Sequence, residues 1–304
     1  MFSISRYGRA GPLRGVAAIT LAVFLLSLSD ALVKLAGERF GLAQLILLRS
    51  LVAGALIGGS IVWLAGRRAL RPRRPGWVWM RSLSLTAMWL SYFASLPSLS
   101  FALAAACYYT SPVWMALMAR LGFGERIGLR GWGAIALSSL GVVLVVDPLG
   151  ESAVPAMLLP LAAAMFYALA ATITWQCCRG EEAGAMAFNL NLCLAVVASV
   201  ALGLIVLMDP AEPDSFVFVT WRAMGVQETA LIALFGVLLA VISTLVAFAY
   251  RSAPSPVVGV VDTGYLAFAI LWSLLIFAET PTYAEAVGIA LIGLGAAIMT
   301  LRTG

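Results

Sequence analysis

The chain has 304 residues, of which 62% are hydrophobic and 11% are charged, and its formal net charge is +5. A soluble domain contains roughly 45–50% apolar and about 25% charged residues, and a single water-soluble core stops growing near ~250–300 residues. Lipid must therefore solvate most of this chain. This excludes a soluble enzyme, a nucleic-acid-binding module and a secreted disulfide scaffold.

A membrane-spanning helix needs about 20 mainly apolar residues. Read from the N-terminus, the chain contains ten runs of suitable length, at about 15–35, 41–65, 77–96, 99–119, 130–147, 154–177, 184–208, 227–250, 256–277 and 282–301. Charge and turn signals separate them, such as the arginine-rich segment 67–74 and the acidic segment 209–214. We interpret the first run as a retained helix rather than a signal peptide, because nine further runs follow it.

The distribution of basic residues predicts the orientation, because Lys and Arg concentrate in short cytoplasmic loops. With the N-terminus inside, fifteen of the nineteen basic residues are cytoplasmic. Three are external, Lys34, Arg39 and Arg222, and Arg49 lies within the second run. The opposite orientation would invert this bias. We therefore predict an all-α polytopic membrane protein with ten transmembrane helices and with both termini in the cytoplasm.

The sequence contains a weak internal repeat with an offset of 154 residues. Segment 103–125 aligns with segment 257–279 without a gap, so that the Glu ending one segment matches the Glu ending the other. In the following runs Gly141 matches Gly295 in the same register. The hydropathy pattern and the shared spacing between Glu and Gly carry this interpretation.

Each half then has five spans, so the second half enters the membrane inverted relative to the first. Inverted repeats of this kind build secondary transporters, with the substrate bound near the midplane between the halves. The predicted parts are a cytoplasmic tail 1–14, a first repeat 15–147, an external linker 148–153, a second repeat 154–301 and a tail 302–304.

Motifs in equivalent positions of the two halves give a more specific likeness. They are Ser111-Pro112, Gly124-Glu125, Gly131 and Gly141 in the first half, and Ala278-Glu279, Gly288 and Gly295 in the second. With these motifs the chain resembles the EamA-type branch of the drug/metabolite transporter superfamily over about 15–301, and in size and aromatic content the bacterial aromatic amino-acid exporters. The resemblance implies metabolite or drug export across the bacterial inner membrane, often driven by an ion gradient. Ala278 departs from the Gly that usually precedes the second Glu.

Ionisable side chains inside lipid cost roughly 2.5–3.5 kcal/mol each, so they need a partner or a function. Asp30 and Lys34 lie one turn apart in the first run, and Arg49 lies at a compatible depth in the second. We expect Asp30 to pair with Lys34, with Arg49 or with both. Alternatively, this cluster lines the outer vestibule and binds the carboxylate or amine of a zwitterionic substrate. Glu125 and Glu279 lie at opposite membrane faces, where each is expected to pin a turn of its own half.

Asp262 lies in the inner half of the ninth run, with Arg251 as its nearest candidate partner in the sequence. It is either a coupling or amine-binding carboxylate, or an interfacial residue satisfied by Arg251 or water. Pro112 removes a backbone hydrogen bond within the fourth run and predicts a kink beside Tyr108 and Tyr109. The kink either serves packing or offers polar groups to a cavity.

The deeper aromatic residues, with a few polar ones, predict a cavity that suits a flat amphipathic ligand. Its candidate residues are Trp89, Tyr92, Tyr108, Tyr109, Pro112, Trp175, Asn189, Thr244, Asp262 and Tyr265. The fifth and tenth runs are rich in glycine and have few polar residues, so we expect them at the periphery, where they brace the bundle or make dimer contacts.

The leading interpretation is a secondary-type transporter that exports small amphipathic metabolites, with aromatic or neutral amino acids first, by alternating access around a central cavity. The alternative is a multidrug or lipophilic-cation efflux protein of the same superfamily, since aromatic rings and Asp262 attract cations. An enzyme is disfavoured because the intramembrane charges do not converge at one depth. The expected partners are a small-molecule substrate and the lipid bilayer, without nucleic acid, and coupling to a proton or another ion is left open.

Histidine is absent and the four cysteines lack C-x-x-C spacing. The absence of histidine excludes zinc sites built on His and Ser-His-Asp triads. The cysteines Cys107, Cys177, Cys178 and Cys193 lie in or at the ends of apolar runs, where they act as small apolar side chains. No cofactor and no metal are expected.

Overall fold

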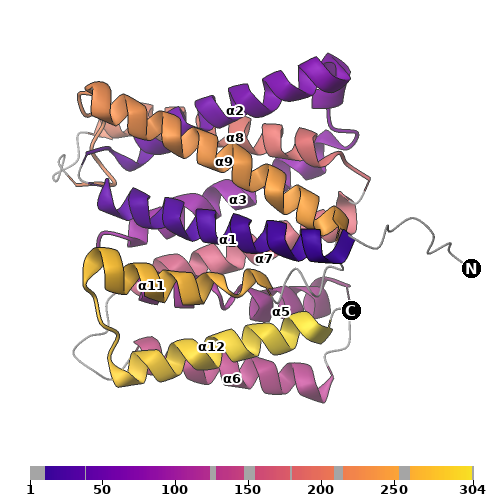
Figure 1. Cartoon of the computed structure of the whole chain (residues 1–304), viewed down its shortest axis with the longest axis vertical. Helices are drawn as coiled ribbons and strands as arrows, with labels where there is room; N and C mark the ends of the chain where they lie inside the picture. Colours follow the sequence, from indigo (N-terminus) through magenta and orange to yellow (C-terminus); the bar gives the residue numbers. More distant parts are fainter. Residues whose placement is uncertain are drawn as a thin grey trace, which may run out of the picture.

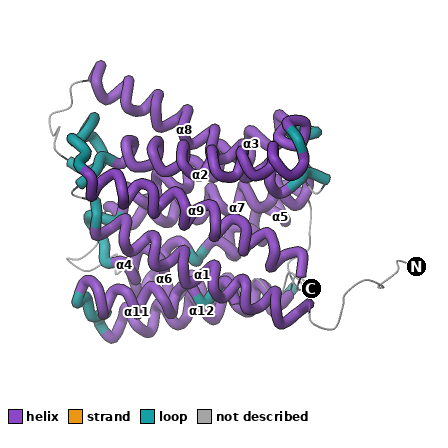
Figure 2. Tube along the Cα trace, turned by 45° about the horizontal axis from the view of Figure 1, so that its top comes forward, coloured by secondary structure: helices purple, strands orange, loops and turns teal. Residues whose placement is uncertain are grey.

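The computed structural model describes residues 11–37, 39–123, 128–146, 155–178, 180–208, 215–252 and 261–302. The regular secondary structure of these residues is entirely helical, and the helices lie side by side in one bundle (Figures 1 and 2). The helices are α1 (Gly11–Leu35), α2 (Leu42–Ala65), α3 (Pro75–Ser95), α4 (Phe101–Tyr108), α5 (Ser111–Phe123), α6 (Leu129–Val146), α7 (Leu158–Cys177), α8 (Ala183–Met208), α9 (Val226–Ser252), α11 (Tyr265–Phe277) and α12 (Tyr283–Arg302), with the short 3-10 turns η1 (Arg67–Leu70) and η2 (Pro155–Met157).

Among the described residues, six helical segments are long and apolar enough to cross a membrane. They are Arg14–Leu35, Leu42–Ala65, Phe101–Met118, Pro155–Thr174, Ala183–Leu207 and Val226–Val246. Helix α3 is less apolar because it carries polar residues such as Ser82, Ser84 and Thr86, which are buried inside the bundle. Leu, Ile and Val side chains remain exposed on many helix faces, as expected for a surface in contact with lipid.

The helix bounds follow the predicted apolar runs. The first helix begins at Gly11, within the segment predicted as a tail. The predicted linker 148–153, the start of the ninth run at 256–260 and Glu125 lie outside the described residues. The two largest differences from uninterrupted spans are breaks in the fourth and ninth runs.

The first break separates α4 from α5 at Tyr109 and Thr110. The helix is interrupted where the kink was predicted, immediately before Pro112, whose ring nitrogen has no hydrogen to donate. The second break lies at Thr263 and Gly264, directly before α11. A Cβ at position 264 would lie 2.8 Å from the carbonyl oxygen of Val261, so this turn requires glycine.

The two breaks are separated by the same 154-residue offset as the sequence repeat. Tyr109 corresponds to Thr263, Thr110 corresponds to Gly264, and the helix resumes at Ser111 and at Tyr265. The break is therefore a feature that the two halves share, although only the first half has a proline beside it.

Helices from the two halves of the chain pack against each other throughout the bundle. Such pairs include α1 with α9, α2 with α8, α3 with α7, α4 with α11, and α6 with α12. The pair α6 and α12 forms one end of the long axis, and α2, α8 and α9 form the other (Figure 1). The start of α1, the end of α12 and the turn between α2 and α3 lie at one edge of the bundle (Figures 1 and 2).

Candidate substrate site

The two helix breaks contact each other inside the bundle. The hydroxyl of Tyr109, at the first break, donates a hydrogen bond to the backbone carbonyl of Asp262, at the second, over 3.0 Å. The ring of Tyr109 also stacks on that of Tyr265, with centroids 5.3 Å apart and an interplanar angle of 29°. An interrupted helix of one half thus contacts an interrupted helix of the other.

Five tyrosines gather around these breaks and are called here the tyrosine cluster: Tyr92, Tyr108, Tyr109, Tyr167 and Tyr265. The ring of Tyr108 lies 5.5 Å, between centroids, from each of the rings of Tyr92, Tyr109 and Tyr167. Tilted and edge-on ring pairs at such distances add to the stability of a core. Four of the five were predicted from the sequence. Tyr167 was missed, because nothing in the apolar run that contains it marks one face as the inner one.

The tyrosine cluster ends in a buried carboxylate. The hydroxyl of Tyr265 donates to Oδ2 of Asp30 over 2.7 Å, and the hydroxyls of Tyr92 and Tyr265 are 3.2 Å apart. Asp30 lies on α1 and is only 3% exposed. The chain Tyr92, Tyr265, Asp30 therefore connects α3, α11 and α1 through polar groups inside an apolar bundle.

The predicted pairing of Asp30 with Lys34 is wrong. The ammonium of Lys34 lies 2.8 Å from Oε1 of Glu279 and also donates to the carbonyl of Leu99 over 2.8 Å. Lys34 lies in the last turn of α1, so its long side chain reaches the connection between α11 and α12. Lys34 thus has two close acceptors, Glu279 and the carbonyl of Leu99, at a partly buried position. Asp30, on the same helix as Lys34, already accepts a hydrogen bond from Tyr265.

Glu279 was expected to pin a turn of its own half, and it does accept from the hydroxyl of Ser273 over 3.0 Å. Its other contacts reach the first half: Oε1 binds Lys34, and Oε2 accepts from the backbone N–H of Phe101, which begins α4, over 3.1 Å. Ala278, in the left-handed conformation with φ 52°, ends α11 and turns the chain before Glu279. Glu279 therefore connects the two halves, which the sequence did not predict.

The predicted ion pair between Asp30 and Arg49 is also not formed. Arg49 is 2% exposed, and its guanidinium carbon lies 4.6 Å from the ring centroid of Trp89 and 4.7 Å from that of Phe93. Aromatic faces attract cations. Arg49 is therefore stabilised by the rings of Trp89 and Phe93, and not by the predicted ion pair with Asp30.

Two further predicted residues lie away from the tyrosine cluster. Asn189 on α8 accepts from the hydroxyl of Ser82 on α3 over 2.9 Å. Thr244 is exposed and donates to the carbonyl of Ala240 in its own helix, α9. Both residues serve helix packing or helix geometry in this structure. The side chains of Pro112, Trp175 and Arg251 lie outside the described part of the structure.

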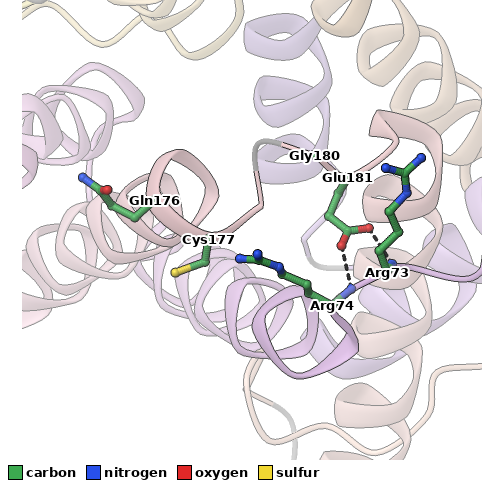
Figure 3. Close-up of a pocket in the computed structure, with 6 residues that line it drawn as sticks. All are labelled: Arg73, Arg74, Gln176, Cys177, Gly180 and Glu181. Atoms are coloured by element: carbon green, nitrogen blue, oxygen red, sulfur yellow. Dashed lines mark hydrogen bonds between the residues drawn. The ribbon is translucent and has the colours of Figure 1, made fainter.

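A separate pocket lies at the edge of the bundle where α3 begins. Glu181 accepts from the backbone N–H of Arg74 over 2.6 Å and from that of Arg73 over 2.8 Å (Figure 3). The pocket has a volume of about 320 Å³ and is lined by Arg73, Arg74, Gln176, Cys177, Gly180 and Glu181. The carboxylate of Glu181 therefore binds the backbone immediately before α3. This contact joins the second half of the protein to the first at this edge of the bundle.

Residues 13–147 match the EamA-like transporter family. The match lies within the first half of the chain. The EamA-type resemblance predicted from the motifs is thereby confirmed for the first half. Because the described residues also include six apolar helical segments of spanning length, the protein is a multi-pass protein of the bacterial inner membrane.

Similar proteins cover most of the chain. The "Riboflavin transporter" of Rhizobium johnstonii is 27% identical over 241 residues, which are 78% of this chain and 74% of the relative. The "Riboflavin transporter" of Vibrio cholerae serotype O1 is 24% identical over 293 residues, which are 95% of this chain and 93% of the relative. A solved crystal structure shares the fold with a TM-score of 0.61 at 20% identity, covering 94% of this chain and 98% of that chain.

Proposed function

We propose that this protein is a secondary-type transporter of a small amphipathic metabolite with a flat aromatic part, which binds at the tyrosine cluster. The observation that carries the proposal is the meeting of two interrupted helices, one from each half, at Tyr109 and Asp262. In transporters built from inverted repeats, discontinuous helices form the substrate site near the membrane midplane. Ring faces and hydroxyls together suit a ligand with a flat apolar part and polar edges.

We further propose that the chain has ten spans in two inverted halves. The helix pairs support this, because exchanging the halves in chain order exchanges α1 with α7, α2 with α8, α3 with α9, α4–α5 with the ninth span, and α6 with α12. Under this exchange the pairs α2–α8 and α6–α12 map onto themselves, and the α4–α11 contact joins the two spans that exchange with each other. The pair α3–α7 maps onto α1–α9, and α5–α7 maps onto α1–α11; all of these pairs are in contact.

The proposed topology has both termini in the cytoplasm and the linker 148–153 outside. It is supported by the common edge at which α1 starts, α12 ends and η1 lies (Figure 1). The η1 turn and the residues after it carry Arg67, Arg68, Arg71, Arg73 and Arg74. Short loops of this kind stay in the cytoplasm.

Riboflavin is the first substrate we propose to test, because both similar transporters named above are riboflavin transporters. Aromatic or neutral amino acids are the second. Both classes combine a flat or apolar part with hydrogen-bonding groups, and both match the rings and hydroxyls of the tyrosine cluster. The EamA-type resemblance further supports outward transport by alternating access.

Counterflow into liposomes that contain the purified protein tests this function. Labelled riboflavin or tryptophan is added outside, with an excess of the same unlabelled compound inside. We expect saturable accumulation that Tyr109→Phe lowers at least about threefold, whereas Tyr283→Phe, at a residue 88% exposed, leaves it unchanged. Accumulation of a lipophilic cationic dye, but of neither metabolite, would overturn the proposal.

A further inference from the structure

Arg49 is a buried cation with two nitrogen donors that are unused among the described residues. Its Nε and Nη2 atoms are buried and have no hydrogen-bond partner among the described residues. Buried polar groups are nearly always hydrogen-bonded, and an uncompensated buried charge is strongly destabilising. A structural arginine at this depth would be expected to bind a carboxylate, as Lys34 binds Glu279.

The aromatic rings around Arg49 attract its positive charge but accept no hydrogen bond from Nε or Nη2. Trp89 and Phe93 present ring faces to the guanidinium, and their centroids are 5.0 Å apart. The ring of Phe93 lies 6.0 Å from that of Tyr92, a member of the tyrosine cluster. The aromatic surface under Arg49 is therefore continuous with the proposed substrate site.

Asp30 provides the matching unused acceptor. Its Oδ2 binds Tyr265, but Oδ1 is buried without a partner among the described residues. Arg49 and Asp30 attract each other electrostatically, yet they form no ion pair. The unbonded donors of Arg49 and the unbonded acceptor of Asp30 thus lie beside the same group of aromatic rings.

We propose that Arg49 binds an acceptor oxygen of the transported aromatic molecule, either a carboxylate or a ring carbonyl. This inference rests on the proposed function and specifies how its substrate is recognised. The planar guanidinium keeps its attraction to Trp89 and Phe93 while its edge donates to the ligand, which a lysine ammonium does not reproduce. Asp30 accepts from an N–H of the same ligand. A carboxylate would come from an amino acid, and a ring carbonyl next to an N–H from a flavin.

Equilibrium binding of labelled riboflavin and labelled tryptophan to the full-length protein in nanodiscs tests the assignment. Arg49→Gln and Arg49→Lys should each weaken binding about tenfold or more, the usual effect of losing a charge-assisted hydrogen bond. The control is Arg120→Gln, which removes another arginine that faces a tryptophan, Trp132, at 5.4 Å. It should leave both affinities unchanged.

The two ligands separate the two sources of the oxygen. Loss for riboflavin alone assigns Arg49 to a ring carbonyl, and loss for tryptophan alone assigns it to a carboxylate. Unchanged binding of both ligands in both Arg49 variants overturns the inference and leaves the proposed function in place. If the wild-type protein binds neither ligand, the proposed function fails, and this inference fails with it.

A second measurement serves if the Arg49 variants do not fold. On the wild-type protein, competitors that lack the acceptor should bind about tenfold more weakly than their parents. The probes are tryptamine against tryptophan, and thio analogues of riboflavin, in which sulfur replaces a ring carbonyl oxygen and accepts poorly. Equal competition by each analogue and its parent would overturn the inference.

Discussion

Gly141 in α6 lies so close to Gly288 in α12 that a Cβ at position 141 would be 2.6 Å from the carbonyl oxygen of Gly288. The reciprocal contact is present too, because a Cβ at Gly295 would be 2.9 Å from the carbonyl oxygen of Ala134. Gly141 matches Gly295 and Ala134 matches Gly288 at the offset of the repeat. The glycine-rich helices, expected to brace the bundle or to make dimer contacts, therefore pack against each other within one chain.

The close approach of α6 and α12 predicts a stability effect that depends on position. Gly141→Ala should lower the stability of the protein by about 1–3 kcal/mol, because the added methyl group must push two backbones apart. Gly133→Ala is the control in the same helix. A Cβ there meets nothing within 4 Å, so the helix-favouring alanine should be neutral or stabilise by up to about 1 kcal/mol. Thermal unfolding of the purified variants measures both, and equal melting temperatures would contradict the prediction.

Ala278 has a conformation that glycine adopts more easily. Its φ of 52° is left-handed, and this costs a residue with a Cβ roughly 1–2 kcal/mol. We expect Ala278→Gly to stabilise the protein by about 0.5–1 kcal/mol, since the greater freedom of glycine in the unfolded chain offsets part of the gain. Ala286→Gly, within α12, should do the opposite. A lower melting temperature for Ala278→Gly would show that this turn is not strained.

The ion pair of Glu279 with Lys34 should contribute to stability more than an exposed pair does. Glu279→Gln removes the charge that binds Lys34, whose side chain is 12% exposed, and should lower stability by about 1–3 kcal/mol. The matched control is Glu228→Gln. Its partner Arg39 is 3.8 Å away and 51% exposed, so the loss should stay below about 0.5 kcal/mol. Unfolding in detergent at low and high salt compares the two, and similar losses would argue against a role for Glu279 in joining the halves.

The hydroxyl of Tyr265 should be worth more than that of Tyr92. Tyr265→Phe removes the hydrogen bond to Asp30 and leaves a buried carboxylate without it, so stability should fall by about 1–3 kcal/mol. Tyr92→Phe removes only the 3.2 Å contact between two hydroxyls, with an expected loss of about 0.5–1.5 kcal/mol. Melting temperatures and counterflow rates of both variants test this order. The reverse order would mean that Asp30 does not depend on Tyr265.

The helical runs and four members of the tyrosine cluster could be predicted, because apolar length and residue type are local properties of a sequence. The break at Tyr109 was predicted from Pro112 for the same reason. The matching break before Tyr265 was not, because it depends on a close backbone approach at Gly264 and has no proline to mark it.

The tertiary structure decides which buried charged groups form ion pairs or hydrogen bonds with each other. Lys34 and Glu279 are 245 residues apart in the chain, and Asp30 binds a tyrosine on α11 rather than the nearer Lys34 or Arg49. Apolar patterning specifies that a helix is buried in lipid or protein, but it barely specifies the rotation of that helix about its axis. The rotation is set when helices of the two halves pack, and only then do Asp30, Arg49 and the tyrosine cluster come to share one surface.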